Sequence, residues 1–241
     1  MTGTTTATLF SSVRSPHCFK VSIVLEEKRV RFERVEIDLP ARQQKSPAYL
    51  AINPRGQVPA YLDDDGAQLD SLDVMLHLEA RHPDPRTVPS DPAGRDAMLA
   101  WIERSSGPMR EVSHRLYWQL LEPPAGGADP AVVAGLVQHG EAELAAIDAE
   151  LRRHEGRWLV PAPDLPGPSL ADAAVYAWVS GYARFGLPRN AASRPGLRSW
   201  LARIDARPSV HASRGAVGRP FDAWLSERAS ERPSAARSES S

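Results

Sequence analysis

The sequence predicts two kinds of structure in succession, an α/β domain over residues 7–82 and an all-α domain over residues 93–226. Strand-like and helix-like segments alternate in the first part, whereas the second part contains only long segments with helical spacing of apolar residues. Between them, residues 83–92 carry four prolines and no apolar periodicity, which is typical of a linker. Residues 1–6 and 227–241 are small or polar, and we expect a flexible N-terminus and a disordered tail there.

Composition and charge indicate an ordinary soluble globular protein. Hydrophobic residues make up 42% of the 241 residues and the formal net charge is -1, so no nucleic-acid partner is expected. No apolar run approaches the roughly 20 residues that a membrane helix needs, and the N-terminus lacks a signal-peptide pattern. We therefore expect no membrane association and a cytoplasmic location. One cysteine and widely scattered histidines predict neither a disulfide framework nor a metal site.

The first predicted strand, residues 7–13, ends in a polar loop that leads directly into a helix over residues 16–28. Ser15 can cap this helix, and the proline after it suits a first helical position because it has no N–H to leave unpaired. His17 and Cys18 then lie in the first turn, where the helix dipole favours an anion such as a thiolate. The structural alternative is an ordinary serine cap with a cysteine that packs beneath the loop.

A second strand is predicted from Arg31 to Leu39, where apolar residues alternate with charged ones. Together with the preceding strand and helix it forms a βαβ unit, whose two strands run parallel. Ser46 and Pro47 are expected to begin a short helix. The turn-forming sequence Asn-Pro-Arg-Gly at residues 53–56 then leads to the next strand.

A hairpin and a helix complete the first domain. The strand over residues 58–62 is followed by a turn at 63–66 and a short return strand at 67–69. A helix with an apolar face then runs to Arg81, and Asp70-Ser71 stands just before it. The order β-α-β, then α, then β-β-α is that of a thioredoxin-like domain.

The second domain is predicted to consist of amphipathic helices. The first covers residues 93–121 and must kink or break at Gly107-Pro108, because proline removes a helical hydrogen bond. Its antiparallel partner covers residues 131–154. A capping box at Ser169–Asp172 opens an apolar helix, and a last amphipathic helix covers residues 195–206.

Two motifs in this order and spacing resemble the glutathione transferase superfamily, and the resemblance covers nearly the whole chain. The first is SPHCFKVSIVLEE at residues 15–27, which is similar to the first-helix motif of classes with Ser or Thr before Pro, especially the Nu class and its disulfide-reductase relatives. The second is NPRGQVPAYLDDDGAQLDS at residues 53–71, which resembles the N-P-x-G-x-V-P…E-S signature. The resemblance implies the glutathione transferase fold, a thioredoxin-like domain followed by an all-α domain.

The second motif also implies where glutathione binds. In the family a cis Val-Pro peptide pairs with the cysteinyl part of glutathione, and the matching residues here are Val58 and Pro59. In the family a Glu-Ser pair binds the γ-glutamyl group, and the matching residues here are Asp70 and Ser71. Asp is one methylene shorter than the usual Glu. The alternative interpretation of this pair is an ordinary helix cap. Candidates for the glycyl carboxylate are Gln57, Lys45 and Arg55.

The first motif implies the catalytic residues. By position, Ser15 donates its hydroxyl to the glutathione sulfur and lowers the pKa of the thiol. His17 serves as a second donor or as a proton acceptor near neutral pH. Cys18 could form a mixed disulfide with glutathione, as in the cysteine-bearing classes. Its position does not match the catalytic cysteine of those classes, which usually stands where Ser15 stands.

In this family the second substrate lies between the loop after the first strand and the long kinked helix. Arg14 in that loop could hold an acidic substrate. A stripe of Trp101, Tyr117 and Trp118 is more typical of helix core or dimer packing than of a substrate wall. The residues that match the pocket by position are Arg14, Met109, Ser113, His114 and Tyr117, with Val13 and Ser105 beside them.

The resulting hypothesis is a cytoplasmic, homodimeric glutathione transferase that uses glutathione as cosubstrate and needs no metal. It would activate the thiol for attack on a small, largely apolar electrophile. One alternative is cis–trans isomerisation, in which glutathione adds to a double bond and leaves again. Further alternatives are glutathione-dependent disulfide reduction and a non-catalytic binding or scaffold protein with the same fold.

Overall fold

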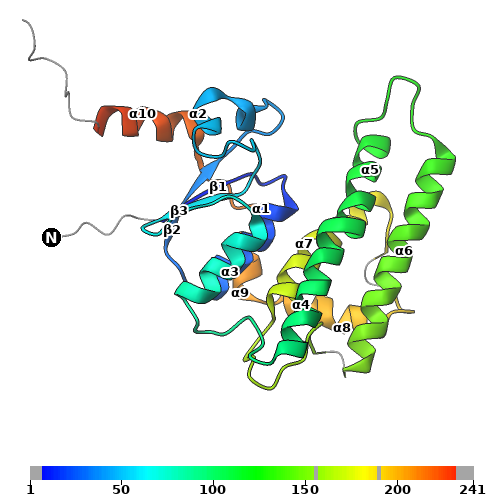
Figure 1. Cartoon of the computed structure of the whole chain (residues 1–241). Helices are drawn as coiled ribbons and strands as arrows, with labels where there is room; N and C mark the ends of the chain where they lie inside the picture. The colour runs from blue at the N-terminus through cyan, green and yellow to red at the C-terminus, as the bar shows by residue number, and fades with distance from the viewer. Residues whose placement is uncertain (1–6, 155–156, 189–190, 232–241) are drawn as a thin grey trace, which may run out of the picture. The chain divides into compact units, whose positions relative to one another are not determined.

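The computed structural model describes residues 7–154, 157–188 and 191–231 (Figure 1). The predicted flexible N-terminus, residues 1–6, and the last part of the predicted tail lie outside these residues. The described chain forms two compact units, which are treated separately below. Of the described residues, the first unit contains 7–18, 31–74 and 215–231, and the second contains 19–30 and those between 75 and 214.

The first unit is built on a five-stranded sheet of order β4-β3-β1-β2-β5. β1 runs parallel to β2, which confirms the predicted βαβ unit, and antiparallel to β3. The β3–β4 hairpin turns where the sequence predicts it, with Asp63 opposite Gly66. Together with the order of the helices, this arrangement is thioredoxin-like. The strands are β1 (Ala7–Ser11), β2 (Phe32–Glu36), β3 (Ala60–Asp63), β4 (Gly66–Gln68) and β5 (Arg219–Pro220).

One face of this sheet is covered by α2 (Pro47–Leu50) and α10 (Phe221–Glu231), which lie side by side in Figure 1. Phe10 of β1 is paired across the sheet with Val35 of β2 and Ala60 of β3, so these three side chains share a face. The aromatic rings of α2 and α10 close over them. The resulting core cluster consists of Phe10, Val35, Ile37, Tyr49, Ala60, Phe221 and Trp224.

The C-terminal segment differs from the sequence prediction. We expected residues up to 226 in the helical domain and a disordered tail from 227, but residues 215–231 belong to the first unit. β5 adds a strand beside β2, and α10 continues to Glu231. The apolar spacing of Phe221, Trp224 and Leu225 explains the difference, because it gives α10 a face that packs on the sheet.

The two predicted helix starts of the first domain are confirmed. α1 (Pro16–Glu27) follows Ser15, and α3 (Ser71–Arg81) follows Asp70. The short predicted helix is α2, where the Ser46 side chain accepts a hydrogen bond from the N–H of Tyr49. A short turn, η1 (Gln43–Lys45), precedes it.

The second unit is helical, and α7 (Leu170–Tyr182) is almost entirely buried within it. The predicted capping box forms, because Asp172 accepts hydrogen bonds from both the N–H and the hydroxyl of Ser169. α4 and α5 pack against α7, while α6 packs against α5 and α8. This unit also includes α1 from Phe19 onward and α3 from Met75 onward, although the sequence places both helices in the first domain. Its other elements are α4 (Pro92–Arg104), η2 (Ser105–Met109), α5 (Arg110–Leu120), α6 (Pro130–Arg153), η3 (Ala183–Phe185), α8 (Pro195–Asp205) and α9 (Pro208–Ser213).

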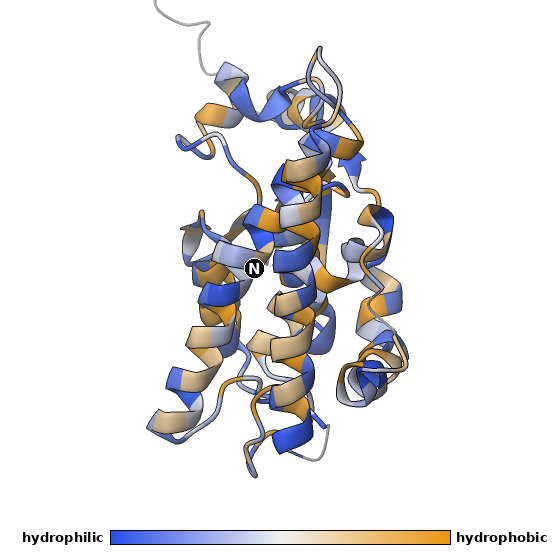
Figure 2. Ribbon diagram, turned by 90° about the vertical axis from the view of Figure 1, so that its right-hand side faces the viewer, coloured by the Kyte–Doolittle hydropathy of each residue, from blue (hydrophilic) through white to orange (hydrophobic). Residues whose placement is uncertain are grey.

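The predicted break in the long helix lies at η2, a wide helical turn that contains Pro108 and separates α4 from α5. Orange and blue residues alternate along the helices in Figure 2, as expected for amphipathic helices. Within the described residues, no helix combines the length and apolarity needed to span a membrane.

Candidate functional site

The first turn of α1 has the cap that its sequence predicts. The backbone N–H of Cys18 donates to Ser15 Oγ at 3.3 Å, and the N–H of Ser15 donates to the carbonyl of Ser12 at 3.0 Å. Ser15 is largely buried, with 9% of its surface exposed. A hydroxyl that accepts one hydrogen bond still has its own O–H to donate. Ser15 can therefore cap the helix and donate to an anion at the same time.

Cys18 lies beneath the loop that precedes α1. Its side chain is 2% exposed, and Sγ accepts a hydrogen bond from the N–H of Ser12 at 3.3 Å. Burial raises the pKa of the Cys18 thiol to about 12, although the hydrogen bonds from Ser15 and Ser12 oppose the shift. A thiol that is buried and protonated is a poor nucleophile. The geometry favours the packing alternative for this cysteine over the mixed disulfide.

Glu36, at the end of β2, anchors the same loop. Its Oε1 accepts hydrogen bonds from the N–H of Val13 at 3.0 Å and from the hydroxyl of Ser12 at 3.3 Å. The sequence prediction did not include Glu36. The predicted βαβ unit could have indicated this residue, because the carboxyl ends of two parallel strands lie at the same edge of a sheet. In the structure Ser11 and Glu36 are partners at that edge. Glu36 thus fixes the course of the chain just before Ser15.

The starts of α1 and α3 meet in the first unit. Ser71 Oγ lies 3.4 Å from Nδ1 of His17, so these two predicted site residues are brought together. Asp70 Oδ1 accepts a hydrogen bond from the N–H of Leu72 at 2.8 Å. Asp70 is therefore the cap of α3, as the alternative interpretation proposed, and it uses one carboxylate oxygen for that purpose.

The Val58-Pro59 peptide is cis, as the family resemblance implied. The carbonyl of the preceding residue, Gln57, accepts two hydrogen bonds, from the hydroxyl of Tyr49 at 2.7 Å and from Asn53 Nδ2 at 2.8 Å. The sequence prediction named Gln57 for its side chain, which is exposed, and missed the role of its carbonyl. These contacts hold the chain rigidly at the entrance to β3.

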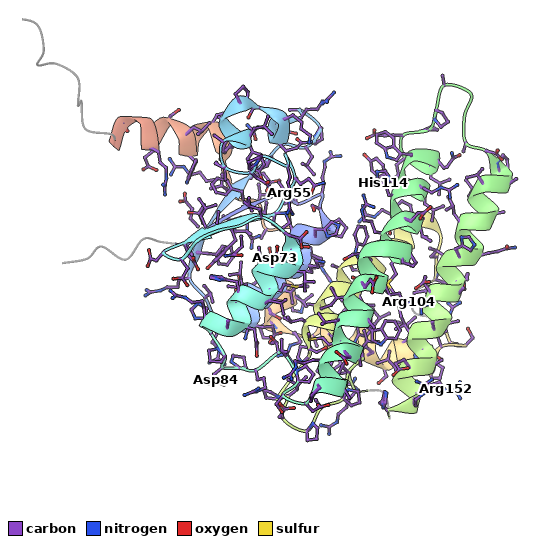
Figure 3. All side chains as sticks on the ribbon, in the orientation of Figure 1. Arg55, Asp73, Asp84, Arg104, His114 and Arg152 are labelled. Atoms are coloured by element: carbon purple, nitrogen blue, oxygen red, sulfur yellow. The ribbon has the colours of Figure 1, made fainter. Side chains whose placement is uncertain are left out.

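Lys45 crosses the loop between α2 and β3. Its Nζ donates to the carbonyl of Arg55 at 3.2 Å, and Arg55 itself is exposed on this loop (Figure 3). Gly56 has a φ of 58°, and a Cβ there would lie 2.7 Å from Lys45 Nζ and 2.9 Å from the carbonyl of Gln44. Glycine suits this position because it adopts a positive φ without strain and has no Cβ to make these close contacts. The ammonium group of Lys45 thus lies beside the backbone of the two residues that precede Gln57.

The residues predicted for the second substrate belong to both units. Arg14 is exposed in the loop of the first unit. In the second unit Met109 is fully buried, and its carbonyl accepts a hydrogen bond from the Tyr182 hydroxyl at 3.3 Å. Ser113 is also buried. These two side chains belong to the packed side of the helix.

His114 and Tyr117 lie nearer the surface of the second unit. His114 is labelled on α5 in Figure 3, and its Nε2 accepts a hydrogen bond from Trp118 Nε1 at 3.1 Å. The Tyr117 hydroxyl donates to Glu122, near the end of the same helix. Trp118 is 48% exposed, so this end of α5 presents aromatic surface to the outside.

Comparisons with known proteins agree with the two motifs. Residues 9–86 match the family model described as glutathione S-transferase, N-terminal domain. Glutathione S-transferase 3 of Zea mays is 30% identical over 215 residues, which cover 88% of this chain and 95% of that protein. A probable maleylacetoacetate isomerase of Caenorhabditis elegans is 29% identical over 152 residues, or 63% of this chain and 69% of the isomerase. The crystal structure of glutathione transferase URE2P8 from Phanerochaete chrysosporium with oxidized glutathione has a TM-score of 0.77 at 21% identity, covering 97% of this chain and 100% of that chain.

Proposed function

This chain belongs to the glutathione S-transferase family, and from that premise we propose that it activates the thiol of glutathione for attack on a small, largely apolar electrophile. The observation that carries the proposal is the hydroxyl of Ser15 at the start of α1. It already accepts the N–H of Cys18, so its remaining O–H is available to donate to a sulfur anion.

The binding mode follows from the three segments around this hydroxyl. The backbone of Val58 pairs with the cysteinyl part of glutathione. The γ-glutamyl carboxylate binds at the hydroxyl and N–H of Ser71, where the start of α3 adds a positive dipole, while Asp70 faces the ammonium group. The glycyl carboxylate binds near Lys45, where the side chains of Gln57 and Arg55 are also exposed. The positive charge of this loop supports that part of the proposal.

The chemistry is stabilisation of the thiolate followed by nucleophilic attack. The thiol loses its proton to solvent, and the O–H of Ser15 and the positive end of α1 stabilise the resulting thiolate. Each pKa unit of acidification corresponds to about 1.4 kcal/mol of preferential thiolate binding. The thiolate then forms a carbon–sulfur bond with the electrophile, and the leaving group departs with the bonding electrons. His17 is a second donor to the sulfur, and Cys18 takes no part in the reaction.

We keep His114 and Tyr117 as candidate substrate residues because both reach the surface of α5, whereas Met109 and Ser113 are buried and hold α5 in the helical unit. Arg14 attracts a substrate that carries an acidic group. The proposal also includes a homodimer in the cytoplasm, and light scattering should give twice the 26.3 kDa mass of one chain.

Isomerisation is the second candidate, and the relationship to the Caenorhabditis elegans protein favours it. In that reaction the same thiolate adds to a conjugated double bond, rotation follows about the bond that has become single, and the thiolate leaves. Product and substrate then have equal mass, and glutathione is regenerated.

Conjugation of an electrophilic chloroarene by the wild type and by the Ser15→Ala and Cys18→Ala variants tests the proposal. We expect Ser15→Ala to lower kcat/KM by about 10²–10³, as for loss of one hydrogen-bond donor to a developing anion, and Cys18→Ala to stay near the wild type. Glutathione binding in calorimetry without turnover of arenes, double-bond isomers or disulfides would favour a scaffold. Absence of glutathione binding by the wild type would overturn the proposal.

A further inference from the structure

The C-terminal segment returns to the first unit and packs tightly along the edge of its sheet. Val35 and Glu36 of β2 pair with Arg219 and Pro220 of β5. A Cβ on Gly218 would lie 2.6 Å from the carbonyl of Arg34, so the segment can pass only because this residue has no side chain. The approach of residues 218–220 is therefore set by close backbone packing.

α10 continues from this strand and places two aromatic rings on the core. Phe221 and Trp224 are stacked with their ring centroids 6.0 Å apart, and both are almost completely buried. The Phe221 ring lies 5.8 Å from the ring of Tyr49 in an edge-on arrangement. In addition, Gln43 Nε2 donates to Asp222 Oδ1 at 3.2 Å. α10 thus contacts η1 and α2, the elements that precede the Val58-Pro59 segment.

Tyr49 connects this aromatic cluster to the Val58-Pro59 segment. Its ring is fully buried, and its hydroxyl donates to the carbonyl of Gln57 at 2.7 Å. Burial raises the pKa of the Tyr49 hydroxyl, so the group remains a donor at neutral pH. Asn53 Nδ2 supplies the second hydrogen bond to the same oxygen at 2.8 Å. Two donors occupy both lone pairs of this carbonyl, which fixes the direction of the peptide.

The direction of that carbonyl determines the direction of the next N–H. In a planar trans peptide the C=O and N–H point to opposite sides. Because the carbonyl of Gln57 points toward Tyr49 and Asn53, the N–H of Val58 points away from them. This N–H belongs to the backbone of Val58, which pairs with the cysteinyl part of glutathione in the proposed function.

We propose that Tyr49 is a positioning residue for glutathione and that α10 holds Tyr49 in place, so that the C-terminal segment sets the affinity for glutathione. The inference rests on the proposed function. Tyr49 touches neither sulfur nor electrophile in this scheme. It acts through the Gln57–Val58 peptide and therefore affects binding rather than the chemical step.

The test is calorimetric titration of glutathione into the wild type and the Tyr49→Phe variant, with steady-state kinetics on both. Tyr49→Phe removes only the hydroxyl, and we expect the Kd for glutathione to rise about 3–10-fold, the equivalent of one neutral hydrogen bond. At saturating glutathione kcat should change less than about twofold, because the lost contact contributes equally in the ground and transition states.

The matched control is Tyr176→Phe. Tyr176 is also fully buried, and its hydroxyl donates to Asp205 in the second unit. This variant loses a buried hydroxyl without touching the Gln57 carbonyl, so its Kd for glutathione should equal that of the wild type. A lower melting temperature in both variants with a raised Kd only in Tyr49→Phe separates positioning from general destabilisation.

A second pair of variants tests the contribution of α10. Phe221→Leu keeps an apolar side chain but removes the ring that contacts Tyr49, and Phe185→Leu makes the same exchange at a buried position of the second unit. We expect only Phe221→Leu to raise the Kd, by about 2–5-fold. An unchanged Kd in Phe221→Leu overturns the role of α10, and an unchanged Kd in Tyr49→Phe overturns the inference as a whole. Failure of the wild type to bind glutathione is a different result, because it overturns the proposed function itself.

Discussion

The hydroxyl of Ser71 lies 3.4 Å from Nδ1 of His17, so the first turns of α3 and α1 meet at one point of the first unit. Each turn lies at the positive end of its helix dipole. In the proposed function this point receives the γ-glutamyl carboxylate on one side and the sulfur on the other. In that proposal His17 contacts Ser71, which binds the γ-glutamyl group, and follows two residues after Ser15, which activates the thiol.

Ser71→Ala should weaken glutathione binding. The hydroxyl is a donor to a carboxylate, and the loss of a hydrogen bond to a charged group is expected to raise the Kd about 10-fold or more, as titration calorimetry can measure. His17→Asn, made alone and combined with Ser71→Ala, completes a double-mutant cycle. Coupling between the two changes is expected because the side chains are in contact. Ser180→Ala, which removes a serine hydroxyl in α7, is the control and should leave the Kd unchanged.

Asp70→Asn should separate helix capping from ligand binding. The amide oxygen of Asn can still accept the N–H of Leu72, so the free energy of unfolding should stay within about 0.5 kcal/mol of the wild type. The charge that faces the ammonium group is lost, and the Kd for glutathione should rise about 10-fold. A wild-type Kd for Asp70→Asn, measured beside Asp70→Ala, would show that Asp70 is a cap and nothing more.

Ser15→Ala and Ser46→Ala form a matched pair, because each serine precedes a proline and caps the N–H three residues later. Both should lose about 1 kcal/mol of stability in urea unfolding. Only Ser15→Ala should raise the pKa of the bound glutathione thiol, by about one unit or more. Ultraviolet absorbance of the thiolate against pH measures this shift directly. Equal thiol pKa values in both variants would remove Ser15 from the chemistry.

Cys18 should make the protein less stable at alkaline pH. The pKa of its thiol is 9.0 when unperturbed and about 12 in the folded protein. Between these values the unfolded chain has released a proton that the folded chain retains, so the free energy of unfolding falls as pH rises, by up to about 1.4 kcal/mol per pH unit. Urea titrations at several alkaline pH values should show this slope in the wild type. Cys18→Ala should show a shallower slope, and an unchanged slope contradicts the buried, protonated thiol.

Local signals predicted most of the fold. The serine-proline pair at Ser15, the capping box at Ser169 and the break at Pro108 are each determined by the backbone chemistry of a few neighbouring residues. The structure has a feature at each of these places. Short-range rules therefore sufficed wherever a cap or a missing N–H determined the local structure.

Contacts between residues far apart in the chain could not be predicted from such local patterns. α10 lies beside Tyr49 only because the chain returns over more than half its length to the first sheet, and no local pattern encodes that return. The same reason explains the omission of Glu36, whose importance depends on the neighbouring strand. For the candidate site, the motif supplied the predicted residues, while the hydrogen-bond partners that hold them are seen only in the structure.

The position of β5 and α10 also has a consequence for the order in which the molecule is made. The sheet that starts with β1 receives its last strand and its aromatic cover from residues 219–231, which leave the ribosome after all the helices of the second unit. During translation β1 is therefore made well before α10, and the side chain of Phe10 lacks the cover of Phe221 and Trp224 until α10 has been synthesised. The sheet of the first unit can therefore be completed only after every helix of the second unit has been synthesised.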